Sequence, residues 1–242
     1  GVTITKEEFR QKMIASAELP KTAQPSIGRF VEVYDELGKN GDSVISIQMM
    51  RSISGTVDAA RQAADITETN VTVVDSDFTS RSLGMIVKEA AKAAQEGKTV
   101  EEILEIVEDA KKRTTLYLTV VNLDNLIKGG RISQLMGMFS NLLNIKLFLQ
   151  VINGKIEIIQ KGRGLKSLQK KYDEIFEQMK AAPNGIQEIG IMHAGLSDFN
   201  EGNIARVREL FPDVPLTIVT TSPIIMSHTG VDAMAITYLE NK

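Results

Sequence analysis

The chain has 242 residues, of which 43% are hydrophobic and 24% charged, with a net charge of -3 and a pI near 5.6. This balance is typical of a globular protein and argues against nucleic acid as a partner and against more than transient contact with an anionic membrane. Cysteine is absent and only His193 and His228 are present, which excludes disulfides and thiolate chemistry and makes a metal site unexpected.

No apolar run approaches the ~18 residues of a membrane span, and the start, Gly1-Val2-Thr3-Ile4, has no signal segment, so we expect a cytoplasmic protein. The length is enough for two modest domains, because domains usually hold about 100–200 residues.

The first segment predicts two helices separated by a polar loop. A Thr-x-x-Glu capping box at Thr5 followed by an apolar stripe indicates a helix over 5–17. Two prolines then interrupt the pattern over 19–26, and Thr22 lies in this loop. A second helix begins near Ser26.

Two strand–loop–helix repeats follow, and they predict a parallel sheet. Strands are expected over 44–47 and 71–74, and helices ending near residues 64 and 95. The loops carry Ser54 and Ser76 and meet at the carboxyl ends of the strands, where open α/β sheets bind ligands. Each serine has two readings, a helix N-cap or a ligand donor, and these can coexist. Asp75 and Asp77 could hold a cation, but local turn chemistry is favoured.

A capping box at Thr99 begins a helix that ends near Lys112, and we place the end of the first domain there. The predicted fold class is α/β with two domains, an N-terminal parallel-sheet domain over 1–114 and a C-terminal α+β domain over 115–242. The second domain has a mainly antiparallel sheet covered by helices, with a hairpin at Asn153-Gly154. Its expected strands cover 115–121, 146–152, 155–160, 188–193, 216–220 and 233–239, and its expected helices 123–128, 134–144, 165–181 and 200–210.

The segment Lys128-Gly129-Gly130-Arg131-Ile132-Ser133 allows two interpretations. Lys-Gly-Gly is an ordinary helix ending. Alternatively, Arg131 beside a sharp glycine turn can hold a carboxylate or phosphate. The helix expected over 134–144 is apolar nearly all round, so it lies in the core or along a pocket in which Met136 and Met138 adapt to an apolar ligand.

The nucleotide fingerprints and the Gly-x-Ser-x-Gly elbow of serine hydrolases are absent. His228 is expected in a polar loop after an extended segment over 223–226, where it could donate to an anion or make a structural hydrogen bond. For His193 a structural bond is favoured. The remaining donors describe a carboxylate site with an apolar tail better than a catalytic one; they are Thr22, Ser54, Arg131 and His228.

Five motifs of this chain resemble those of the DegV family in order and spacing. They are residues 21–26 (KTAQPS), 52–56 (SISGT), 73–76 (VVDS), 128–133 (KGGRIS) and 227–230 (SHTG). Members of that family are two-domain bacterial fatty-acid binders. The resemblance implies the acyl-carrying subunit of fatty acid kinase, which presents a fatty acid to an ATP-using partner for conversion to an acyl phosphate in phospholipid synthesis.

The resemblance implies a role for each of the four donors. Thr22 and Ser54 match the family's carboxylate-binding hydroxyls, Arg131 its arginine near the head group, and His228 its C-terminal histidine. Ser76 and Gly130 are further ligand-binding candidates. No catalytic residue, metal or cofactor is implied beyond the bound fatty acid.

The chain departs from the family pattern at several places. Ala23 replaces a serine, Met50-Arg51-Ser52 replaces Ser-Ser-Gly, and Gly230-Val231-Asp232 replaces Gly-Pro-Gly. The family's opening strand is missing before Val2, which indicates either a truncation or a first sheet that is completed differently. The alternative function is a small-molecule hydrolase that uses Ser54 or Ser76 with a histidine.

Overall fold

The computed structural model describes residues 3–131 and 145–242. The chain forms two compact units. We call the first the two-stranded unit, residues 23–114 with the hairpin tip 152–155. We call the second the six-stranded unit, whose described residues are 3–22, 115–131, 145–151 and 156–242.

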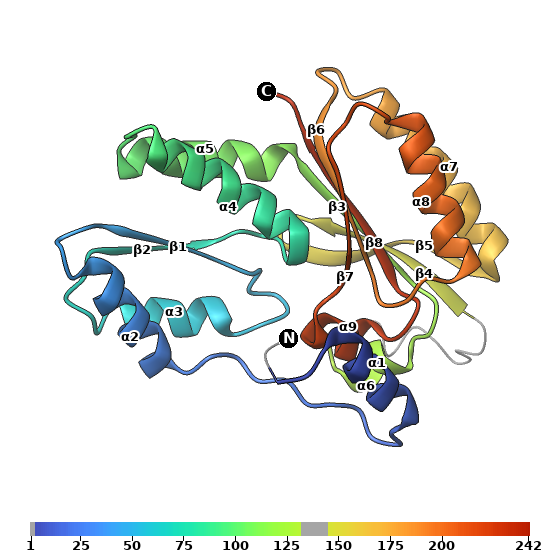
Figure 1. Cartoon of the computed structure of the whole chain (residues 1–242), viewed down its shortest axis with the longest axis horizontal. Helices are drawn as coiled ribbons and strands as arrows, with labels where there is room; N and C mark the ends of the chain where they lie inside the picture. Colours follow the sequence, from blue (N-terminus) through green and yellow to red (C-terminus); the bar gives the residue numbers. More distant parts are fainter. Residues whose placement is uncertain (1–2, 132–144) are drawn as a thin grey trace. The chain divides into compact units, whose positions relative to one another are not determined.

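The two-stranded unit contains the two predicted βα repeats. Strands β1 (Val44–Gln48) and β2 (Val71–Asp75) pair in parallel. Its helices are α2 (Ile27–Gly38), α3 (Thr56–Ala64), α4 (Ser80–Gln95) and α5 (Val100–Arg113), and Figure 1 shows β1 and β2 between α2–α3 and α4–α5. The alanine-rich face of α3 explains its close approach to the sheet, because Ala60 and Ala63 are fully buried.

The six-stranded unit is built on a mixed sheet with the strand order β5-β4-β3-β8-β6-β7. Its strands are β3 (Thr114–Val120), β4 (Ile145–Ile152), β5 (Lys155–Arg163), β6 (Ile186–His193), β7 (Leu216–Thr220) and β8 (Met234–Glu240). β3 pairs antiparallel with β4 and β6 with β8, whereas β6 and β7 are parallel. Asn153 and Gly154 both have positive φ, as the predicted two-residue hairpin turn requires.

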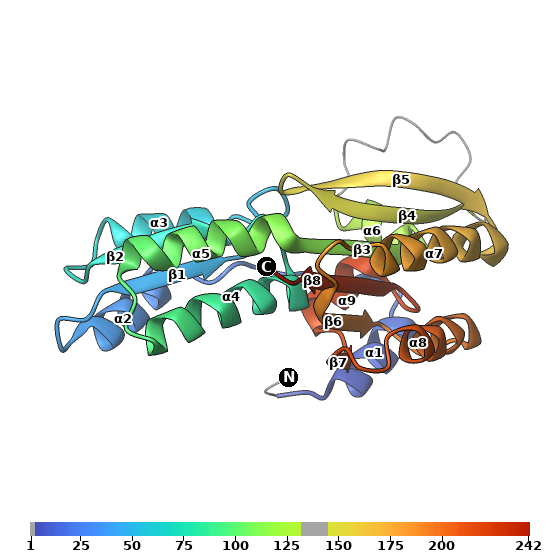
Figure 2. The same ribbon diagram turned by 90° about the horizontal axis from the view of Figure 1, so that it is seen from above.

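Helices α7 (Leu165–Lys180) and α8 (Asp198–Leu210) cover the main core of this unit, whose buried side chains include Phe148, Tyr172 and Phe176. Figures 1 and 2 show α7 and α8 side by side along the sheet. Of the three shorter helices, α9 (Pro223–Thr229) packs against both α1 (Lys6–Ala15) and α6 (Asp124–Lys128), and Figure 1 shows the three near one another.

The division into units differs from the expected domains 1–114 and 115–242 at the start of the chain. The observed units and the expected domains share a boundary between residues 114 and 115, but in the structure the residues up to Thr22 belong to the six-stranded unit. The reason is packing of α1, because Met13 joins a buried cluster with Ala194 and Met226, and Lys6 Nζ donates to the backbone oxygen of Thr220 over 2.6 Å.

The prediction of an extended segment over 223–226 is wrong. These residues open α9, because the Ser222 hydroxyl accepts from the Ile225 amide at 3.4 Å and Pro223 occupies the first helical turn, where its missing amide has no cost. His228 therefore stands on a helix rather than in a loop. The helix expected over 134–144, and Ile132 and Ser133 of the glycine motif, lie outside the described residues.

Both predicted capping boxes, at Thr5 and Thr99, are confirmed. Among the described residues, no helix has the length and apolar character needed to cross a membrane.

Candidate ligand-binding site

Two of the predicted donors meet in the six-stranded unit although they lie 206 positions apart in the chain. The Thr22 hydroxyl lies 2.9 Å from Nε2 of His228. Thr22 follows α1 in the extended loop that its prolines favour, and His228 stands in the last turn of α9. Packing of Met13 on α1 against Met226 on α9 holds the two segments together.

The surroundings of His228 decide its protonation state. Burial, and then the nearby Arg131 charge, lower the pKa of the imidazole, so it is neutral at pH 7. Its Nδ1 is buried with no hydrogen-bond partner among the described residues. A buried N–H without an acceptor is costly, so we assign the proton to Nε2, which donates to Thr22. The Thr22 O–H can then donate to a ligand.

The glycine motif forms one wall beside the imidazole. Gly129 ends α6 and donates its amide to the backbone oxygen of Asn125 at 2.8 Å, and Gly130 adopts a left-handed φ of 71°. A Cβ built on Gly129 would lie only 2.6 Å from Nδ1 of His228. The segment is therefore a helix ending, and its first glycine is also what allows the histidine ring to come close.

Arg131 follows this turn on the surface. Its Nη1 donates to the Gly129 backbone oxygen at 2.7 Å, which folds the side chain back over the turn. After burial, the positive charge of Arg131 is the second cause that lowers the pKa of the His228 imidazole. Thr22, His228, Gly129 and Arg131 thus form a cluster of one hydroxyl, one imidazole and one guanidinium on a glycine turn.

Asn125 is a residue that the sequence interpretation missed. Its Nδ2 donates to the Ser227 backbone oxygen at 3.1 Å and so joins α6 to α9, next to His228. A single asparagine in a short helix carries no signal of this role, because its acceptor is a backbone group that only the tertiary fold supplies.

The two serines of the βα loops belong to the two-stranded unit. The Ser54 hydroxyl is hydrogen-bonded to the Thr56 hydroxyl at 2.8 Å and accepts from the Thr56 amide at 3.2 Å, while Gly55 is the N-cap of α3. Ser76 has no exposed surface, and its hydroxyl donates to the Phe78 oxygen and accepts from the Phe78 amide, both at 3.1 Å. Ser76 therefore stabilises its own loop.

The acidic residues of the second loop behave as turn residues. Asp75 accepts from the Asp77 amide at 3.0 Å, and the Asp77 carboxylate pairs with Lys111 Nζ at 2.8 Å. In the described part of the chain, no group of three or more His, Cys, Asp or Glu side chains could hold a metal ion.

His193, the other histidine, ends β6 and is 8% exposed. Burial is the main cause of its lowered pKa, and the charges of Arg10 and Lys6 add to the effect. Its backbone oxygen accepts from the Thr221 amide at 2.9 Å, which continues the pairing with β7.

Comparison with known proteins decides the family. A family model described as "Uncharacterised protein, DegV family" matches residues 1–241. The chain belongs to the DegV family. A DegV domain-containing protein of Streptococcus pneumoniae is 42% identical over 233 residues, which cover 96% of this chain and 82% of that protein.

Solved DegV structures share the fold. The chain is similar to DegV, a fatty acid binding protein from Bacillus subtilis, with a TM-score of 0.86 and 28% identity over 97% of this chain and 84% of that one. It is also similar to the Streptococcus pneumoniae fatty acid kinase (Fak) B3 protein loaded with linoleic acid, with a TM-score of 0.81 and 26% identity over 99% and 85% of the two chains. The two-domain α/β fold class is confirmed.

Proposed function

We propose that this chain binds a long-chain fatty acid and presents its carboxylate to a partner kinase, which converts it to an acyl phosphate. The observation that carries the proposal is the Thr22–His228 pair beside Arg131 in a chain of the DegV family. DegV proteins with similar structures are described as fatty acid binding, and one is a fatty acid kinase component.

The cluster suits a carboxylate. A carboxylate that leaves water needs hydrogen-bond donors, and a charge-assisted bond is about twice as strong as a neutral one. With the proton of His228 assigned to Nε2, the Thr22 oxygen accepts from the imidazole and its O–H is left to donate to one carboxylate oxygen. Arg131 supplies the positive charge. For Ser54 the proposal rests on the resemblance of its motif alone.

In the proposed function, the chain is a carrier of the fatty acid and has no catalytic activity of its own. In the reaction, one carboxylate oxygen of the acyl group attacks the γ-phosphorus of ATP held by the kinase, and ADP leaves with the electron pair of the broken bond. The residues of this chain hold the carboxylate ionised and oriented. No further cofactor is proposed.

The geometry does not favour the hydrolase alternative for Ser76. A nucleophilic serine must be accessible and bonded to a base, whereas Ser76 is fully enclosed and both hydrogen-bonding roles of its hydroxyl are used by Phe78. The Ser54 hydroxyl is bonded to Thr56.

Replacement of the guanidinium tests the proposal. Arg131→Ala should raise the dissociation constant for oleate at least about tenfold, because one charged hydrogen bond contributes about 1.5–3 kcal/mol. The free energy of unfolding should change by no more than about 1 kcal/mol, since Arg131 is exposed and its bond to the Gly129 oxygen lies at the surface. Isothermal titration and urea denaturation measure the two quantities. An equal loss of binding and stability would make Arg131 a structural residue.

A further inference from the structure

The outer edge of the six-stranded sheet is a strand with unused backbone groups. β7 is the last strand in the order and pairs with β6 alone within the described residues. The Ile189 amide donates to the Pro215 oxygen, and the Thr221 amide donates to the His193 oxygen, each at 2.9 Å. Because hydrogen-bonding direction alternates along a strand, the N–H and C=O groups of Leu216 and Ile218 point away from β6.

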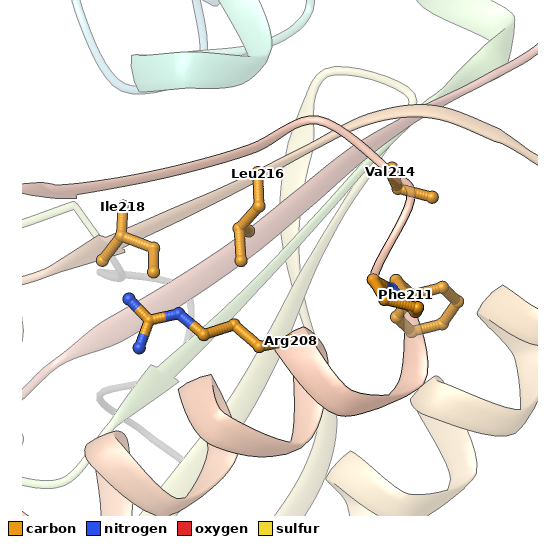
Figure 3. A pocket seen from close by; sticks show the side chains of 6 residues that line it. Arg208, Phe211, Val214, Leu216 and Ile218 are labelled. Atoms are coloured by element: carbon orange, nitrogen blue, oxygen red, sulfur yellow. The ribbon is translucent and has the colours of Figure 1, made fainter.

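An open cavity of about 540 Å³ lies beside this edge, between β7 and α8. Its lining residues are Arg208, Phe211, Pro212, Val214, Leu216 and Ile218. Figure 3 shows the Arg208 side chain reaching from α8 with its guanidinium on the side of Leu216 and Ile218. We call the cavity together with the outward edge of β7 the β7 groove.

One cation, Arg208, lines the β7 groove, and a second, Lys6, lies at the end of β7. Arg208 is exposed, and no ion pair to it is found in the described part of the chain. Lys6 Nζ lies 2.6 Å from the Thr220 oxygen, at the other end of the strand. A ligand that adds a strand along Leu216 and Ile218 meets backbone groups that β6 does not use. The Thr220 oxygen beyond them is already bonded to Lys6. The cavity offers apolar side chains for contact with an alternate side chain of the ligand, and the Arg208 cation favours acidic residues.

We propose that the β7 groove docks an extended, acidic segment of the partner kinase by strand addition. This inference rests on the proposed function. Its position supports the kinase as occupant, because only Thr221 and Ser222 separate β7 from α9, the helix that carries His228. A segment that runs along β7 therefore leads, within the same unit, to the end of the sheet where α9 begins.

A second copy of the chain is the competing occupant. Antiparallel pairing of two β7 strands about a twofold axis at Ile218 would set the two Arg208 guanidiniums on either side of that axis, since each lies beside its own Ile218. Like charges placed together oppose association, whereas an acidic segment is attracted.

The test uses the whole chain loaded with oleate and the ATP-using subunit of the fatty acid kinase from the same organism. Arg208→Glu reverses the charge of the groove. Ile218→Pro removes an N–H that points away from β6 and leaves the hydrogen bonds between β6 and β7 in place. Proline is tolerated at such positions of an edge strand. Lys170→Glu makes the same charge change on the exposed face of α7 and is the matched control.

Each variant is first analysed for retained oleate and for its melting temperature, and the rate of acyl phosphate formation is then measured against the concentration of the loaded chain. Arg208→Glu and Ile218→Pro should keep oleate and raise the KM for the loaded chain about tenfold or more with little change in kcat, whereas Lys170→Glu should behave as wild type. The KM of Arg208→Glu should also lose most of its dependence on salt.

The outcomes separate this inference from the function on which it rests. Wild-type KM values for both groove variants would overturn the docking inference and leave the carrier function standing. A wild-type chain that holds oleate but yields no acyl phosphate would overturn both. Sedimentation measures whether the wild-type chain is a dimer. A wild-type dimer that becomes monomeric in Arg208→Glu or Ile218→Pro would assign the groove to a second copy of the chain and refute the kinase as its occupant.

Discussion

The close contact between Gly129 and His228 leads to a specific prediction about ligand binding. A Cβ at Gly129 would lie 2.6 Å from Nδ1 of His228 and 2.7 Å from the Asn125 oxygen. Ordinary van der Waals contact begins at 3.4 Å, so in Gly129→Ala the backbone at the end of α6 must shift to relieve the Asn125 contact, and the separation from the imidazole must grow by about 0.8 Å. The φ of Gly129 is -73°, which alanine adopts without strain, so the effect is purely steric.

Overpacking of this kind typically costs about 1–3 kcal/mol. If the cost falls on the position of His228, the dissociation constant for a fatty acid should rise about 5- to 150-fold. Gly130→Ala is the matched control. A Cβ there has open space, but its φ of 71° disfavours alanine by about 1–2 kcal/mol. Gly130→Ala should therefore lower stability, and its loss of affinity should be smaller than that of Gly129→Ala because its Cβ does not touch the imidazole.

Displacement of a fluorescent fatty acid analogue gives the dissociation constants, and urea denaturation gives the free energies of unfolding. Unchanged affinity in Gly129→Ala would refute the argument that the ring position of His228 controls binding. Equal losses of affinity in Gly129→Ala and Gly130→Ala would refute it as well, because the turn as a whole would then be responsible.

Two further predictions concern the donors themselves. Thr22→Val should weaken oleate binding about 10- to 150-fold, because a hydrogen bond to a charged group contributes about 1.5–3 kcal/mol. Thr22→Ser keeps the hydroxyl and should bind oleate within about threefold of wild type. Equal titration curves for the two variants would exclude Thr22 as a donor. The pKa values of His193 and His228 are lowered in the native chain, so below about pH 6.5 the unfolded chain binds protons that the native chain does not. The free energy of unfolding should therefore decrease as the pH is lowered, by at most about 1.4 kcal/mol per pH unit for each histidine. Urea denaturation between pH 5 and 7.5 measures this slope, His193→Gln and His228→Gln should each reduce it, and a slope unchanged in both variants would contradict the assignment.

Much of the fold could be predicted because its signals are local. The strands β1 and β2 are runs of β-branched residues, and α1 and α5 begin at capping boxes, so both type and order follow from neighbouring residues. The grouping of α1 with the six-stranded unit could not be predicted, because it depends on Met13 packing against side chains about 200 residues away.

The start of α9 was predicted wrongly although a signal is present. Pro223-Ile224-Ile225-Met226 has the composition of a strand, but Ser222 followed by Pro223 is also the ordinary start of a helix. The N-cap bond and the packing of Met226 in a buried cluster decide in favour of the helix.

The candidate site was accessible to sequence reasoning only in part. Thr22 and His228 were selected by residue type and by motif, and the fold places them 2.9 Å apart. The contribution of Gly129 is a close approach of two segments, and that of Asn125 is a bond to a distant backbone oxygen. Such contacts depend on tertiary positions and leave no local pattern.

The central claim is that the chain carries a fatty acid, and the most direct measurement is the lipid content of the purified protein. Extraction with organic solvent followed by mass spectrometry should recover about one long-chain fatty acid per chain, and a large part of it should be lost in Thr22→Val. Protein that is consistently empty and also rejects added oleate in a titration would contradict the claim.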